Sequence, residues 1–147
     1  SISWRANVII NKLTATAIAT LAVSLSILLA AQTSFDATSV LTASKTITGQ
    51  PLRRPKTRSP EISSVLVEIM PGGESGRHKH PVPPHIYVIE GVVSIEFDDR
   101  RRKTFSAGEG FLEAVDTWHN AKNLGKNPVK MLVVFFGEKG KNNMVRP

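Results

Sequence analysis

Short apolar segments separated by turn residues run through residues 62–136, and this pattern constrains the fold more than any other feature of the sequence. Within residues 62–70, Val65, Val67 and Ile69 occupy alternate positions, which is the period of a half-buried β-strand. Further strands are expected at residues 85–89, 92–97, 103–105, 111–115 and 129–136, with glycine, proline and aspartate turns between them. Because no amphipathic helix interrupts the series, the sequence predicts an all-β barrel or sandwich.

The four histidines of the chain are clustered. His78, His80 and His85 lie within eight residues, and His119 lies in a second glycine-bounded segment downstream. In a strand, His78 and His80 share one face, with Cα atoms roughly 6.6 Å apart at a rise of about 3.3 Å per residue. Two imidazoles at this spacing can bind one ion at about 2.0–2.1 Å from each nitrogen. The clustering therefore predicts a metal site, with Lys79 pointing away from it.

The position of His85 depends on a turn. Three prolines within residues 81–84 end the strand that carries His78 and His80. His85 then opens the apolar run at residues 86–89, which is expected to form a buried strand. We expect this pair of strands to bring His85 back beside the other two rings.

The first histidine segment resembles the first motif of the cupin family. Gly72 is followed after five residues by the sequence His-Lys-His at residues 78–80, and Gly91 closes the segment. The family carries a glutamate ligand between the second histidine and the closing glycine. Counted from the second histidine this position is His85, and counted back from the glycine it is Pro84, so no carboxylate is available. His85 either replaces the glutamate or stays outside the site.

The second cupin motif is matched in spacing by Gly108, His119 and Asn123. Two positions depart from it, because Ala114 stands where the family has proline and Asp116 where it has glycine. The resemblance covers roughly residues 62–136.

The resemblance implies an all-β cupin domain at residues 61–137, a double-stranded β-helix of the jelly-roll barrel type. It also implies a metal site formed by His78, His80 and His119, with His85 as the candidate fourth ligand. Imidazole ligands suit several divalent transition metals, so the ion is Fe, Mn, Zn, Ni or Cu.

Three functions are open to such a domain. The resemblance implies a metal-dependent oxygenase or isomerase that acts on a small molecule inside the barrel. The alternative is a non-catalytic protein that binds a small molecule or a metal, and the third is a structural or oligomerising unit. No catalytic residue is assigned. Glu113 is the carboxylate nearest the second motif, but strand alternation can aim it outward.

Residues 1–31 have the pattern of a signal peptide. Arg5 and Lys12 provide positive charge, an apolar stretch without acidic residues follows, and Ala30-Ala31 fits a small-residue cleavage site. The apolar stretch approaches the ~20 residues that span a bilayer, so an uncleaved helical membrane anchor is the alternative. The sequence therefore predicts a periplasmic or secreted protein, or else a membrane-anchored one.

The segments on either side of the domain are polar. Residues 32–60 are rich in Ser, Thr, Pro and Arg and are expected to form an extended arm or linker, although Leu41, Ile47 and Leu52 could let part of it lie along the sheet as an edge strand. Residues 138–147 are expected to be a loose tail. Since small cupins can exchange their N-terminal strands, the resemblance also implies a homodimer.

The chain is basic, with a net charge of +7. Its basic runs at residues 53–58 and 100–103 contain none of the aromatic side chains on which nucleic-acid bases stack. We therefore expect a small-molecule ligand and no nucleic acid. The absence of cysteine excludes disulfides and thiolate metal ligands.

Overall fold

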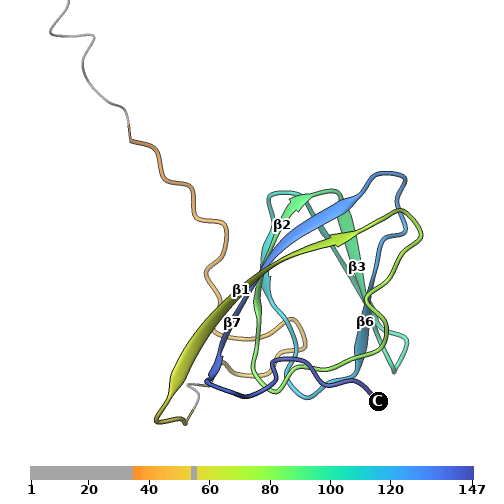
Figure 1. Ribbon diagram of the computed structural model, residues 1–147. Coiled ribbons are helices and arrows are strands. Elements are labelled where there is room, and N and C mark those ends of the chain that lie inside the picture. Colours follow the sequence, from red (N-terminus) through yellow and green to blue (C-terminus); the bar gives the residue numbers. More distant parts are fainter. Residues whose placement is uncertain (1–34, 54–55) are drawn as a thin grey trace, which may run out of the picture. The chain divides into compact units, whose positions relative to one another are not determined.

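Seven β-strands and no helix form the secondary structure of residues 35–53 and 56–147, the part of the chain that the computed structural model describes (Figure 1). In this part there is accordingly no helical candidate for a membrane span. The signal peptide or anchor predicted for residues 1–31 lies outside the described residues. The strands are β1 (Pro60–Ile69), β2 (His85–Glu90), β3 (Val92–Phe97), β4 (Arg102–Ser106), β5 (Gly110–Leu112), β6 (His119–Lys122) and β7 (Val129–Glu138).

The strands form two antiparallel sheets, with the order β1-β7-β2-β5 in one and β4-β3-β6 in the other. The pairing of β1 with β7 is the longest and runs from Pro60 opposite Glu138 to Ile69 opposite Val129. This arrangement confirms the predicted all-β sandwich. Each sheet turns alternate side chains toward the other, as the two-residue period of the sequence requires.

The core lies between the two sheets and consists of aliphatic and aromatic side chains. From the larger sheet it receives alternate residues of β2 and β7, and from the smaller sheet alternate residues of β3. The fully buried members with the largest side chains are Val88, Val93, Ile95 and Val129. The burial of each such side chain stabilises the fold by about 1.5–3 kcal/mol. A slip of one residue would turn these side chains to the other face, so the apolar pattern fixes the register between strands.

The predicted strands agree with the observed ones to within a few residues, except at β6 and at residues 78–80, where the predicted strand is replaced by isolated bridges. The sequence analysis predicted no strand at β6, because His119, Asn120, Ala121 and Lys122 carry little apolar surface. Pairing with β3 holds β6 in place instead. The two strands pair from Ser94 opposite Lys122 to Phe97 opposite His119.

Part of the predicted arm lies along the edge of β5. The amide of Ile47 donates a hydrogen bond to the carbonyl oxygen of Leu112 over 2.8 Å, and the Ile47 side chain packs against the core. The side-chain amide of Gln50 bonds both main-chain groups of Val115, donating over 2.8 Å and accepting over 2.9 Å. The edge of the larger sheet that β5 forms is thereby covered.

The C-terminal residues pack against the histidine segment, where a loose tail was predicted. The main chains of Lys79 and Val145 exchange two hydrogen bonds of 3.0 and 2.9 Å. The guanidinium of Arg146 donates to the carbonyl oxygen of Ser75 over 3.0 Å. Short-range sequence patterns do not register such pairing, because it depends on a segment far away in the chain.

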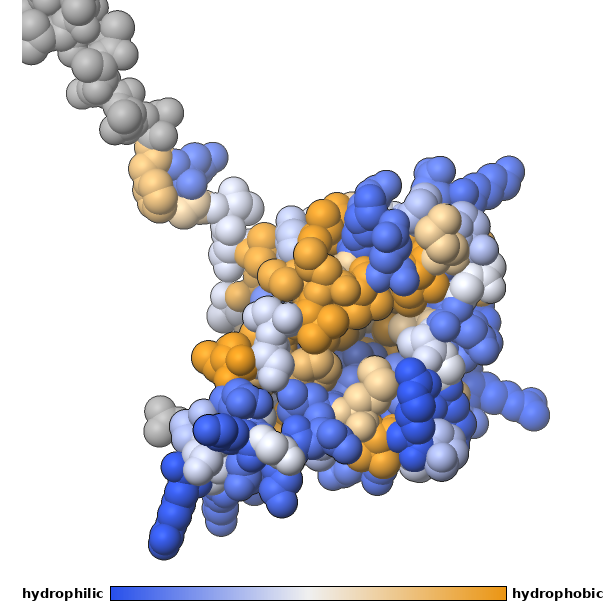
Figure 2. All heavy atoms as spheres, viewed as in Figure 1, coloured by the Kyte–Doolittle hydropathy of each residue, from blue (hydrophilic) through white to orange (hydrophobic). Residues whose placement is uncertain are grey.

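β1 presents an apolar outer face. Ile62 and Leu66 are exposed large side chains on this edge strand, and the exposed Met70 follows it directly. Figure 2 shows apolar side chains gathered over β1 and β7 on this face of the molecule. The predicted homodimer stays a prediction.

Replacement of Gly91 tests the close contact between the β2–β3 turn and β7. Gly91 has a φ of 79°, and a Cβ there would lie 2.5 Å from the carbonyl oxygen of Pro128; Gly108 has a φ of 90° but open space around it. Gly108→Ala is expected to lower the free energy of unfolding by about 1–2 kcal/mol through backbone strain alone. Gly91→Ala should cost at least about 1 kcal/mol more, because the neighbouring backbone must also shift. Denaturant unfolding of both variants measures this, and equal losses would contradict the close contact.

Candidate metal centre

Main-chain hydrogen bonds hold the two histidine segments side by side. The amide of His78 donates to the carbonyl oxygen of His119 over 2.9 Å, and the amide of His119 donates back to His78 over 2.9 Å. A second bridge joins Glu74 to Lys122. Residues 74–80 therefore lie along β6, on the side that β3 leaves free, and two distant parts of the sequence meet at one place.

Three of the four predicted histidines come together in the interior. His78, His80 and His119 are 3%, 2% and 1% exposed, and their ring centroids lie 4.4–5.2 Å apart. One ring nitrogen from each residue lies within 4.8 Å of the corresponding atoms of the other two, so the three could hold a metal ion. Lys79 points away, with its Nζ 3.4 Å from an Oδ1 of Asp116.

Each of the three rings is fixed by a main-chain carbonyl group. The Nδ1 atoms donate over 2.7, 2.7 and 2.8 Å to the carbonyl oxygens of Gly76, Asn143 and Thr117, for His78, His80 and His119 respectively. Because a carbonyl oxygen can only accept, each Nδ1 carries a proton, and each neutral ring keeps its lone pair on Nε2. This is the tautomer in which metal-binding histidines are held by their outer partners.

Glu113 completes the cluster. Its carboxylate is buried, with Oε1 3.2 Å from Nε2 of His119 and Oε2 3.6 Å from Nε2 of His80. Despite this proximity, Glu113 Oε1 and His119 Nε2 have no hydrogen-bond partner among the described residues. In the neutral tautomer of His119, two buried lone pairs face each other across this distance. A cation that both atoms bind satisfies both, so the donor set fits a metal ion.

The protonation states in this cluster suit metal binding. Burial, together with the neighbouring His119 and His80, lowers the pKa of His78 to about 4, against the bond to Gly76 and the charge of Glu113. Burial alone would raise the pKa of the Glu113 carboxyl, but the adjacent imidazoles of His80, His119 and His78 outweigh it, so the pKa lies below its ordinary value. A neutral imidazole and an ionised carboxylate are the forms that bind metals.

Glu113 directly follows β5 and was not predicted as a metal ligand. The amide of Glu113 donates to the carbonyl oxygen of Pro84 over 3.0 Å, next to the pairing of His85 with Leu112. Pro84 is one of the two positions where the glutamate of the first cupin motif would be expected. The expectation that alternation can aim Glu113 outward does not hold. Phe111, two residues earlier, is buried, and this spacing was the signal for an inward Glu113.

The structure does not bring His85 to the cluster. On β2, Ile86 and Val88 are buried, and His85 lies on the opposite face of the strand. Its Nε2 instead lies beside Gly110 of β5, 3.6 Å from the point where a Cβ at that position would lie. The turn through residues 81–84 does return the chain to the site, but in a register that points this ring outward.

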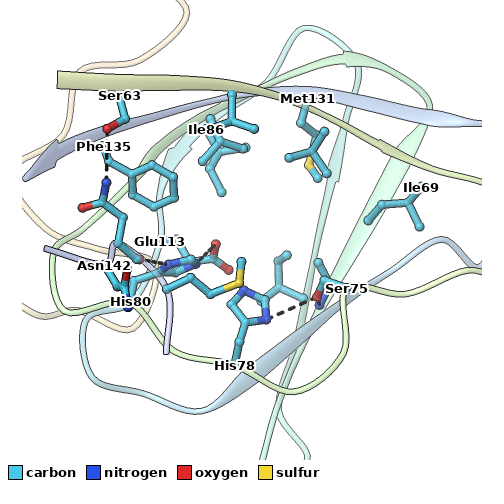
Figure 3. A pocket seen from close by; sticks show the side chains of 17 residues that line it. Ser63, Ile69, Ser75, His78, His80, Ile86, Glu113, Met131, Phe135 and Asn142 are labelled. Atoms are coloured by element: carbon cyan, nitrogen blue, oxygen red, sulfur yellow. Dashed lines mark hydrogen bonds and ion pairs between the residues drawn. The ribbon is translucent and has the colours of Figure 1, made fainter. Parts of the chain in front are cut away.

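The cluster lies at one side of a cavity of about 360 Å³ between the sheets. Figure 3 shows His78, His80 and Glu113 pointing into this space, with Ile86 and Met131 on the wall across from them. Most of the lining is apolar, and its members are Val65, Val67, Ile69, Ile86, Ile95, Ala121, Met131, Val133, Phe135 and Met144. A small molecule of largely apolar surface can therefore reach the cluster.

Comparison with known proteins agrees with this geometry. A family model described as the cupin domain matches residues 65–135. Residues 65–135 form a cupin domain. A search of curated proteins found no match.

Solved cupin-like structures are similar to this domain in fold. An oxalate decarboxylase of Lactobacillus farciminis, in complex with formate, is 28% identical over 57% of this chain and 26% of its own, with a TM-score of 0.49. A conserved Klebsiella pneumoniae protein with a double-stranded β-helix domain is 20% identical over 63% of this chain and 87% of its own, with a TM-score of 0.50. The chain thus matches about a quarter of the decarboxylase, and the second likeness shows the fold alone.

The C-terminal residues of this chain take part in the site of the cupin domain. The carbonyl oxygen of Asn143 is the acceptor that fixes His80, and Asn142, Asn143 and Met144 line the cavity. The side-chain amide of Asn143 also donates to Oγ of Ser63 on β1, over 3.3 Å. The segment after β7 thereby connects the histidine segment to the opposite sheet.

Removal of this segment tests its contribution. A chain that ends after Lys141 loses the carbonyl group that holds the ring of His80, so its affinity for zinc is expected to fall about 10–100-fold. Asn143→Ala keeps that carbonyl group and should stay within a factor of about 3 of the unmodified protein. Competition with a chromophoric chelator measures both affinities. Unchanged affinity in the shortened chain would exclude this role for the segment.

Proposed function

We propose that this cupin domain binds one divalent transition-metal ion through His78, His80, His119 and Glu113, and that the ion holds a small molecule in the adjacent cavity. The observation that carries the proposal is the buried pair of unsatisfied atoms, His119 Nε2 and Glu113 Oε1, 3.2 Å apart. Such a pair is costly in the absence of a shared cation, because each atom loses its hydrogen bonds to water and gains none.

The donor set consists of three neutral imidazole nitrogens and one carboxylate oxygen. It suits iron, manganese, zinc, nickel or copper, and the chemistry of the ligands does not choose among them. Four histidine ligands, as considered from the sequence, would carry no charge, whereas Glu113 gives the ligand set one negative charge. A site that holds a divalent ion is then left with one positive charge. When bound, the ion supplies Lewis acidity toward an oxygen atom of the small molecule.

The chain's own residues supply position and exclusion of water. The carbonyl oxygens of Gly76, Asn143 and Thr117 hold the three rings in one orientation, and the apolar walls keep the surroundings of the cluster dry. Among the described lining residues, His78, His80 and Glu113 are the titratable ones, and all three are assigned to the ion. An isomerase needs a further proton carrier, so we favour an oxygenase among the enzymes and ligand binding without turnover as the alternative.

Metal analysis of histidine variants tests the centre. His119→Ala removes a buried ligand and is expected to lower the zinc content from about one ion per chain to near zero. His85→Ala, at a histidine of the same segment that lies outside the cluster, should leave the content unchanged. Elemental analysis after dialysis gives both values, with circular dichroism as the check on folding. Full zinc content in folded His119→Ala would refute the centre.

Glu113→Gln tests the carboxylate separately. The amide has the same shape but no charge, so the zinc affinity should fall at least about tenfold. Glu109→Gln is the matched control on the turn before β5, where the exposed carboxylate bonds only the amide of Ser106, and its affinity should stay within a factor of about 2. Equal affinities in the two variants would remove Glu113 from the ligand set.

Export is a separate proposal that depends on residues 1–31 alone. A periplasmic or secreted cupin would acquire its metal outside the cytoplasm, and an uncleaved segment would hold it at the membrane.

A further inference from the structure

We propose that the small molecule of this centre has an apolar body and a single monoanionic oxygen head group, such as a carboxylate, phenolate or enolate, and that small dianions are excluded. The proposal rests on the metal centre proposed above. It extends that proposal by naming the class of ligand from the cavity that surrounds the ion.

The cavity wall contains no cation among the described residues. Its polar members other than the cluster are Ser63, Ser75, Asn142 and Asn143, which carry no charge. A ligand can hydrogen-bond to these groups, but none of them neutralises a negative charge. The rest of the wall is aliphatic, aromatic or methionine, and it favours a hydrocarbon or ring surface.

The cations beside the histidines are directed elsewhere. The guanidinium of Arg77 lies 2.6 Å from a carboxylate oxygen of Asp98, and the ammonium of Lys79 lies 3.4 Å from Asp116. Alternation along residues 77–80 places these two side chains on the face opposite the rings. Neither can reach into the cavity while the histidines point there.

The charge of the ligand follows from the count of charges at the centre. A divalent ion with neutral imidazoles and one carboxylate from Glu113 has one positive charge left. A monoanionic oxygen group neutralises it. A second negative charge on the same small molecule would be buried against apolar side chains without a partner, which is strongly unfavourable.

The size of the ligand follows from the space. A cavity of about 360 Å³ is at the lower end of the range of small-molecule sites, so the ligand is a compact molecule with one ring or a short branched chain. Ile95, Phe135 and Met131 line the space that this body would occupy.

Benzoate and benzene-1,4-dicarboxylate are a matched pair of probes, because they differ only in a second carboxylate on a rigid ring. Titration calorimetry of the zinc-loaded protein is expected to give benzoate at least about a tenfold tighter dissociation constant. 1-Phenylbutane-1,3-dione serves as the enolate probe. Its affinity relative to that of benzoate shows whether the site prefers an enolate or a carboxylate head group.

Val65→Lys places a cation in the cavity wall, on an edge strand where this residue is 45% exposed. The variant should bind the dicarboxylate at least about tenfold tighter than the unmodified protein, while benzoate changes little. Leu66→Lys adds the same charge at the next position, which faces outward and is 76% exposed, and should leave both affinities unchanged.

Failure of this inference differs from failure of the metal centre. If the protein loads zinc and binds the dicarboxylate as tightly as benzoate, or binds none of the three probes, the ligand class is wrong and the centre stands. If the unmodified protein does not load zinc at all, the centre is wrong and the ligand class is rejected with it.

Discussion

The main-chain pair between His78 and His119 is the contact on which the rest of the site depends. It joins the segment at residues 74–80 to β6, so that the smaller sheet gains a further extended segment on the side that faces the cavity. Without this register, the two rings would not project from neighbouring positions, and β6 itself would have little apolar surface to hold it in place. Since one residue of slippage would turn both rings to the other face, the ligands are positioned by main-chain hydrogen bonds rather than by contacts between side chains.

Glu113 shows how a fold can replace a ligand that its sequence motif has lost. The first motif has proline or histidine where its glutamate is expected, and the carboxylate enters from β5, directly beside Pro84. An ion responds to the position and charge of the donor atoms, and their order along the chain is irrelevant to it. A motif search therefore finds no carboxylate at this site, whereas the fold places one beside His80 and His119.

The parts of this structure that could be predicted from sequence depend on local periodicity. The apolar alternation gave the main strands, and strand geometry gave the common face of His78 and His80. Asn123, which the motif spacing singled out, holds loop backbone, since its side-chain amide donates to the carbonyl oxygens of Ile69 and Asn127. β6, the inward Glu113 and the packing of the last residues could not be predicted in this way, since each depends on pairing with a distant segment. The place of His85 on the outer face of β2 could not be predicted for the same reason, because the turn was recognised but its register was not.

The contact between Asn143 and His80 has a consequence for biosynthesis. The acceptor that fixes this ring lies 63 residues further along the chain, so His80 cannot take its final orientation until Asn143 has been synthesised. The complete histidine cluster then forms only after β7 and the segment that follows it have been synthesised. A fusion partner attached after Pro147 would lie close to the segment that lines the cavity.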